Sequence, residues 1–121
     1  MLAIAASIAC AARAEPMLIG RKDDGKVVAL KAGRPLVLEL EGNPTTGFDW
    51  VLEPGAEALG KPVERWVGPG EKEGAGAVKR FEWATAGAVP GTYQVRIAYR
   101  RRTEQKPPLE VFGFTLRVEA G

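Results

Sequence analysis

The side chains that usually carry hydrolytic chemistry are almost absent from this chain. Its 121 residues include no histidine, one serine (Ser7) and one cysteine (Cys10). Serine or cysteine triads and zinc sites built from Cys and His are therefore excluded, and we expect no metal and no cofactor. Carboxylates remain, but Glu39, Glu41 and Glu82 fall at strand or turn positions, and the sequence pairs none of them across a cleft. The residue types predict a protein that binds and does not catalyse.

One segment has the composition of a binding loop. It reads Asn43, Pro44, Thr45, Thr46, Gly47 and Phe48, with Asp49 and Trp50 following. Pro44 fixes its own φ and biases Asn43 toward extended geometry, while Gly47 permits a positive φ. We expect a stiff, protruding turn with two small hydroxyls at its tip, which would lose little entropy on entering a narrow cleft. An ordinary turn of a β-sandwich is the alternative.

The elements that must position this turn are short strands. Apolar residues recur two apart in residues 36–40, 93–99 and 112–118, the spacing that places them on one face of a strand. Weaker strands are predicted at residues 27–30, 48–52, 62–67 and 78–84, with an edge strand at 17–19 and one helical turn at 56–59. The 15 glycines and 9 prolines supply frequent turns. Seven or eight such strands predict an all-β fold, an immunoglobulin-like antiparallel β-sandwich.

The first 14 residues differ in composition from the rest. They are mostly small and apolar, and Ala12 and Ala14 are small residues at the positions that a signal peptidase reads, so cleavage is predicted after Ala14. An apolar N-terminal helix of the folded domain is the alternative; the run is shorter than the about 20 residues that a membrane-spanning helix needs. Cleavage would leave residues 15–121 as one domain in the periplasm or outside the cell. Lipidation at Cys10 is less favoured, because Ser7 stands where a large aliphatic residue is expected.

The charge balance excludes one class of partner. The net charge is +2, and the one basic run, Arg100 to Arg102, is local. Nucleic-acid binding needs clustered positive charge over a surface, so no nucleic-acid partner is expected. We also expect no membrane span, and a monomer.

The string from Asn43 to Phe48, with Trp50 two residues on, resembles the motif of the chagasin family, inhibitors of papain-like cysteine peptidases. The resemblance implies an immunoglobulin-like β-sandwich in which three neighbouring loops form a wedge that enters the peptidase cleft. It makes residues 43–48 the first loop, with Thr45 and Thr46 against the catalytic cysteine and histidine of the target. The implied function is reversible, competitive occlusion of the active site.

The same resemblance assigns two further loops. The second is glycine-rich and precedes a strand with aromatics, and here it comprises Gly74, Ala75, Gly76 and Ala77. The third follows the strand at 93–99 and comprises Arg100, Arg101, Arg102 and Thr103. Arg101 matches the family arginine, whereas Arg102 replaces a proline and Thr103 a tryptophan. Loss of that aromatic anchor predicts weaker inhibition or a different target preference, and extra arginines would compensate where the rim of the target is acidic.

The sequence leaves two other functions open. The altered third loop is consistent with a periplasmic immunoglobulin-like interaction module that does not inhibit peptidases. A carboxylate-dependent glycosidase or carbohydrate-binding sandwich using Trp50, Trp66 and Trp83 is a third reading, although packing in the core is favoured for these tryptophans. Tyr93, after Pro90 and Gly91, either ties a strand to the preceding connection in a tyrosine corner or simply follows a turn.

Overall fold

The computed structural model describes residues 15–68 and 77–120 and contains, within them, eight strands and three short 3-10 turns. The strands are β1 (Met17–Ile19), β2 (Val27–Lys31), β3 (Leu36–Gly42), β4 (Phe48–Leu52), β5 (Val63–Val67), β6 (Ala77–Trp83), β7 (Gly91–Arg101) and β8 (Glu110–Glu119). The 3-10 turns are η1 (Arg21–Asp23), η2 (Pro44–Thr46) and η3 (Glu57–Leu59). No helix in this described part is long and apolar enough to cross a membrane.

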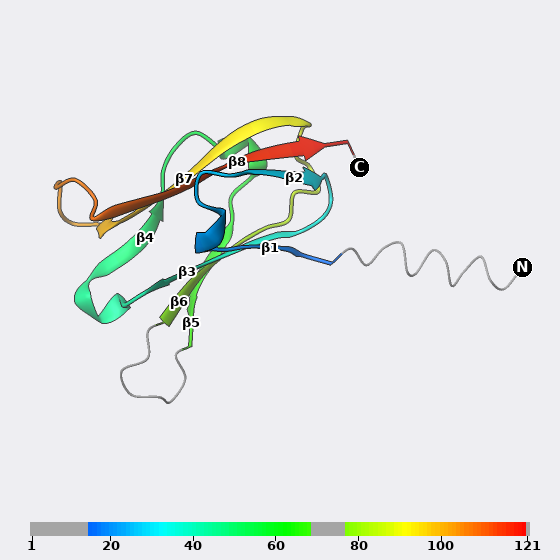
Figure 1. The fold of residues 1–121 in the computed structure, drawn as a ribbon. Helices are drawn as coiled ribbons and strands as arrows, with labels where there is room; N and C mark the ends of the chain where they lie inside the picture. Colours follow the sequence, from blue (N-terminus) through cyan, green and yellow to red (C-terminus); the bar gives the residue numbers. More distant parts are fainter. Residues whose placement is uncertain (1–14, 69–76, 121) are drawn as a thin grey trace, which may run out of the picture.

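The strands form two four-stranded sheets packed face to face (Figure 1), so the predicted all-β sandwich is confirmed. One sheet has the order β1-β3-β6-β5 and the other β2-β8-β7-β4. The central pairs are antiparallel, but β1 runs parallel to β3 and β2 runs parallel to β8, so both sheets are mixed. The period-two pattern could not reveal this, because it fixes which face a side chain occupies and not which strand lies beside it.

The core lies between the two sheets and follows the predicted alternation. Its largest fully buried side chains include Leu36, Leu38 and Leu40 of β3, Phe81 and Trp83 of β6, Trp50 of β4, Val95 and Ile97 of β7, and Phe112 and Leu116 of β8. Full burial of one such aliphatic or aromatic side chain contributes about 1.5–3 kcal/mol. Trp50 and Trp83 are each 1% exposed, so neither presents a sugar-binding face, and the glycosidase or carbohydrate-binding reading is wrong for these two residues.

The tyrosine corner is formed. The Tyr93 hydroxyl donates a hydrogen bond to the carbonyl of Val89, four residues earlier, and so ties the start of β7 to the connection that leaves β6. Of the two readings that the sequence left open at Tyr93, the structure selects this one.

Strand ends from both sheets meet at one end of the sandwich, called the site pole here. Gly42 at the end of β3 pairs with Ala77 at the start of β6, and Phe48 at the start of β4 pairs with Arg101 at the end of β7. The connection from β3 to β4 crosses between the sheets, whereas the connections β5 to β6 and β7 to β8 each join neighbours within one sheet. The crossing connection therefore lies between the β7–β8 connection of one sheet and the adjacent ends of β5 and β6 in the other. In Figure 1, η2 and the connection between β7 and β8 lie together at the left.

Candidate functional site

The first loop, residues 43–48, is an exposed turn held by its own side chains. Its centre is the 3-10 turn η2, capped by Asn43, whose Oδ1 accepts hydrogen bonds from Thr45 N at 3.1 Å and Thr45 Oγ1 at 2.6 Å. The Thr46 hydroxyl donates to the carbonyl of Asn43 at 2.8 Å. Gly47 closes the turn with a φ of 84°, a conformation that side chains disfavour. Both hydroxyl protons are thus used inside the loop, which leaves exposed hydroxyl oxygens as acceptors.

Aromatic side chains support this loop from below. The Tyr99 hydroxyl accepts a hydrogen bond from Asn43 N at 3.2 Å, and the Trp50 indole donates to the carbonyl of Glu41 at 3.0 Å. The Tyr99 ring also packs on Trp50, with centroids 4.7 Å apart, and on Phe48, with centroids 5.3 Å apart. Sequence reasoning did not assign Tyr99 to the site. Its position as the last inward residue of the alternating run 93–99 was the available signal.

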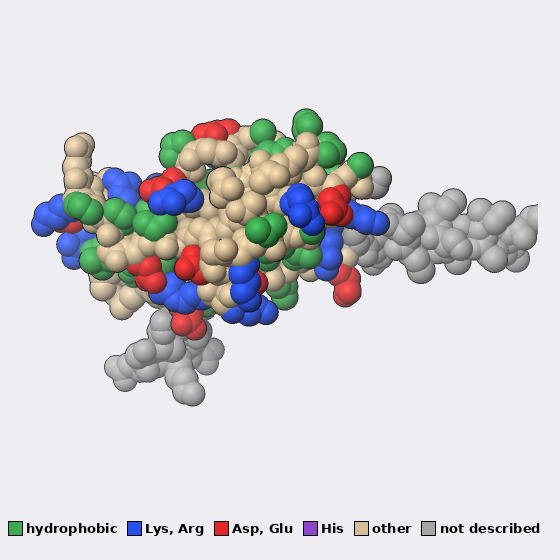
Figure 2. All heavy atoms as spheres, turned by 45° about the horizontal axis from the view of Figure 1, so that its top comes forward, with side chains coloured by type: hydrophobic (Ala, Val, Ile, Leu, Met, Phe, Trp, Pro, Cys, Tyr) green, Lys and Arg blue, Asp and Glu red, His purple; other side chains and the backbone are tan. Residues whose placement is uncertain are grey.

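The third loop, residues 100–103, lies against the first. Arg101 Nε donates to the carbonyl of Thr46 at 3.2 Å, and its guanidinium carbon lies 4.5 Å from the centroid of the Phe48 ring. Arg100 donates to the carbonyl of Glu104 at 3.3 Å. Figure 2 shows Lys and Arg side chains gathered at the left end of the molecule, on the side where Figure 1 has this loop. The arginines are therefore partly occupied within the protein itself.

Arg102 and Thr103 stand where the family resemblance places proline and tryptophan. Both side chains are exposed. Arg102 Nε nevertheless donates to Asp49 Oδ2 at 3.0 Å, just beyond the first loop. The structure thus brings the first and third loops together through contacts of Arg101 with the first loop and of Arg102 with Asp49, the residue that follows it.

The second loop falls largely outside the described residues, which exclude Gly74, Ala75 and Gly76. Ala77 is described: it begins β6, lies opposite Gly42, and is 3% exposed. Its side chain is buried, so a contact from Ala77 to a partner would have to come from its backbone. Gly68, after the end of β5, and Ala77, at the start of β6, both lie at the site pole.

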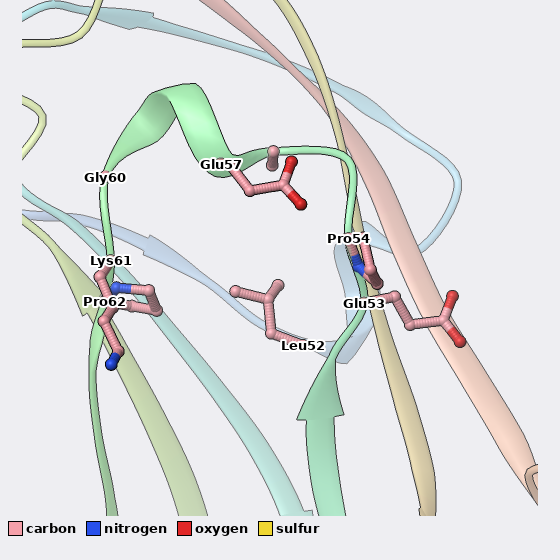
Figure 3. A pocket seen from close by; sticks show the side chains of 8 residues that line it. Leu52, Glu53, Pro54, Glu57, Gly60, Lys61 and Pro62 are labelled. Carbon is pink, nitrogen blue, oxygen red and sulfur yellow. The ribbon is translucent and has the colours of Figure 1, made fainter.

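A cavity of about 360 Å³ lies at the opposite pole, between the end of β4 and the start of β5 (Figure 3). Its wall is largely apolar, and Glu53 and Glu57 are its two carboxylates. Glu53 forms an ion pair with Arg96 at 3.2 Å, and Glu57 accepts a hydrogen bond from Gly55 N at 3.0 Å. Both carboxylates are thus engaged by the fold, which argues against a pair poised for glycoside hydrolysis in this cavity. Within residues 15–68 and 77–120, no group of His, Cys, Asp and Glu is arranged to hold a metal ion.

The fold and the site pole define a β-sandwich protein that presents loops for binding. Residues 29–118 match the model of the chagasin family of peptidase inhibitors, I42. Because this match spans about three quarters of the sequence, the chain belongs to the chagasin family. Membership favours peptidase inhibition over the alternative of an interaction module without it. Among curated proteins, no sequence matches this chain significantly.

Solved structures of similar fold support the architecture. The cysteine protease inhibitor EhICP2 from Entamoeba histolytica is similar over 88% of this chain and 98% of its own, with a TM-score of 0.70 and 16% identity. Amebosin is similar over 88% of this chain and 99% of its own, with a TM-score of 0.66 and 20% identity. PbICP-C, solved in complex with falcipain-2, is similar over 87% and 99%, with a TM-score of 0.51 and 21% identity. At these identities the likeness establishes the shared β-sandwich fold.

Proposed function

We propose that this protein is a reversible, competitive inhibitor of papain-like cysteine peptidases and that its first loop occupies the active-site cleft. Membership of a peptidase-inhibitor family gives the activity, and the similarity to EhICP2, named as a cysteine protease inhibitor, supports the target class. The observation that carries the proposal is the first loop itself: an exposed turn at the site pole that is held in shape by its own hydrogen bonds. A loop ordered before binding loses little entropy in a cleft.

The geometry of η2 supports inhibition without rapid cleavage. An extended strand is a common form in which a bound peptide is recognised. Residues 44–46 instead form a 3-10 turn, closed by a hydrogen bond from Gly47 N to the carbonyl of Pro44 at 3.2 Å. Extending them would break this bond and the bonds to Asn43. In the proposed complex the loop offers hydroxyl and carbonyl oxygens near the catalytic thiol and imidazole, but no peptide bond aligned for attack.

The flanking loops would supply most of the remaining contact. We propose that the second loop (74–77) and the third loop (100–103) lie on either side of the cleft, since the strand ends that border them lie beside the first loop at the site pole. A tight interface of standard size buries about 800 Å² on each partner. A protruding turn alone is small for such an area, so participation of both flanking loops is part of the proposal.

Titration of papain with the purified protein is the direct test. We expect loss of activity on a small fluorogenic substrate that is relieved by raising the substrate concentration, and recovery of activity on dilution. Gel electrophoresis after prolonged incubation should show the inhibitor chain intact. Absence of inhibition at micromolar protein, or steady cleavage of the chain within residues 43–48, would contradict the proposed function.

We propose further that residues 1–14, which lie outside the described residues, are a cleaved leader and that the mature protein is periplasmic or secreted. The support is the apolar run ending in Ala12, Arg13 and Ala14. Mass spectrometry of the exported protein is expected to find Glu15 at the N-terminus. An exported chain that retains Met1, or one that carries a lipid on Cys10, would overturn cleavage after Ala14.

A further inference from the structure

A cluster of four charged side chains joins three strands to the third loop. Lys79 of β6 lies between Asp49 of β4, at 2.8 Å, and Glu64 of β5, at 3.5 Å. Arg102 approaches the same two carboxylates, at 3.0 Å from Asp49 and 3.8 Å from Glu64. We call these four residues the ion cluster. Since β4 and β5 are edge strands of different sheets, the cluster connects the two sheets at one side.

Burial of Lys79 and Asp49 distinguishes the centre of this cluster from ordinary surface ion pairs. The Lys79 side chain is 6% exposed and that of Asp49 is 18% exposed, whereas Arg102, at the outer side of the cluster, is 54% exposed. The Lys79 ammonium also lies 5.6 Å from the ring centroids of Trp66 and Phe81. A single exposed pair contributes little, because solvent screens it and two long side chains must be ordered. Charges held out of water interact more strongly, and one that loses its partner is costly.

Asp49 is the hub of the cluster. Its Oδ1 accepts hydrogen bonds from Lys79 Nζ at 2.8 Å and from Trp50 N at 2.8 Å, while its Oδ2 accepts from Arg102 Nε at 3.0 Å. Asp49 directly follows the first loop, and Arg102 belongs to the third loop. One carboxylate therefore fixes the distance between the two loops, with its position set by a buried lysine.

We propose that Arg102 is a positioning residue: its guanidinium stays on the ion cluster and holds the third loop against the first, and it does not contact the peptidase. We call the contact of Arg102 with the ion cluster the clamp. Its effect on inhibition rests on the proposed function, but the clamp itself is a property of the free protein. It gives Arg102 a role at the position where the family resemblance places a proline. It also implies that ion pairs of Arg102 order the third loop, which lacks the tryptophan that would contact the target.

The first experiment uses the free protein. Arg102→Met removes the charge and keeps the length of the side chain. Glu104 N donates to the carbonyl of Arg101 at 3.2 Å in the turn that Arg102 begins, so the amide of Glu104 reports on the order of the loop. We expect its hydrogen exchange to become at least about fivefold faster in Arg102→Met. The matched control is Arg96→Met, which breaks an exposed ion pair between Arg96 of β7 and Glu53 and should leave the exchange of this amide unchanged. Unchanged exchange in Arg102→Met overturns the proposal.

The second experiment separates positioning from direct contact. Arg102→Met is expected to raise the inhibition constant for papain about five- to tenfold, within the range of coupling between contacting groups. In an Asp49→Asn background, where the hub has lost its charge, the same substitution should have less than about a twofold effect. Asparagine still accepts from Trp50 N and leaves Lys79 paired with Glu64. An undiminished effect of Arg102→Met in the Asp49→Asn background would mean that Arg102 contacts the peptidase, and would overturn the proposal. If Asp49→Asn unfolds, the exchange of the Glu104 amide in the free protein decides.

The two proposals fail in different ways. If the unsubstituted protein does not inhibit papain while Glu104 exchange is accelerated in Arg102→Met, the clamp stands and the proposed function fails. If the protein inhibits papain and Glu104 exchange is unchanged, the proposed function stands and the clamp is rejected.

Discussion

Thr46→Arg is expected to raise the inhibition constant for papain by at least about 100-fold. The Thr46 side chain is exposed at the outer end of the first loop, and under the proposed function it faces the catalytic pair of the peptidase. Loss of a central contact in a tight interface costs about 2 kcal/mol or more, which is roughly 30-fold in affinity. An arginine side chain in the same space adds a steric clash and the burial of a charge, so the total is expected to be larger.

The fold should survive this substitution. Within the described residues, the Thr46 side chain makes one hydrogen bond as donor, to Asn43, and one weak one as acceptor, from Phe48 N at 3.4 Å. The loss of such exposed bonds costs about 1 kcal/mol of unfolding free energy. The matched control is Thr92→Arg, which adds the same charge at an exposed threonine near the opposite end of β7 and should inhibit normally. Normal inhibition by Thr46→Arg would show that the first loop is not part of the interface. Weakened inhibition by both variants would indicate general charge repulsion.

Gly42→Ala is expected to lower the free energy of unfolding by about 2 kcal/mol, in the range that overpacking of a filled site produces. A Cβ atom at Gly42 would lie 3.0 Å from Trp66 Cη2, 3.1 Å from Tyr99 Cε1 and 3.2 Å from Trp50 Nε1. The Trp50 and Tyr99 rings cannot easily move, because Trp50 is 1% exposed and is tied to Glu41, and Tyr99 packs on it. The thermal midpoint should fall on the order of 10 °C.

A matched glycine provides the control for this prediction. Gly87 is exposed, its φ also lies outside the left-handed region, and a Cβ there would meet nothing within 4 Å. Gly87→Ala should change the unfolding free energy by less than about 0.5 kcal/mol, as is usual at such surface positions. Chemical denaturation of the three proteins measures the difference. Equal stability of the two variants would show that the aromatic side chains under the first loop yield easily, and that they are not a rigid support.

The sequence predicted the strands well because alternation is a local property. The predicted strand at 48–52 coincides with β4, and the run 93–99 lies within β7. Partner and direction could not be predicted in the same way: β1 and β2 join their sheets in parallel, which depends on pairing between residues far apart in the chain. The one-turn 3-10 geometry of η2 also depends on hydrogen bonds to Asn43 that no periodicity encodes.

The sequence predicted the first loop of the candidate site but not the ion cluster beside it. The order of Asn43, Pro44 and Gly47 contains its own turn chemistry, so residues 43–48 were identified as an exposed turn. The ion cluster was missed, because it brings together side chains from four separate segments. Lys79 gave one signal: it has the same inward phase as Phe81 and Trp83, and a lysine at such a position requires buried carboxylate partners.

The β3–β4 and β7–β8 connections differ in which strands they join, and this difference matters for engineering of the loops. The β3–β4 connection spans the gap between the sheets, so its length is coupled to their spacing, whereas the β7–β8 connection joins two neighbours already paired within one sheet. Insertions and randomised sequences should therefore be tolerated in residues 103–109 far better than in 43–47. A library diversified in the β7–β8 connection, with the first loop kept constant, could be selected for new peptidase specificities in the way that antibody loops are matured on a fixed framework.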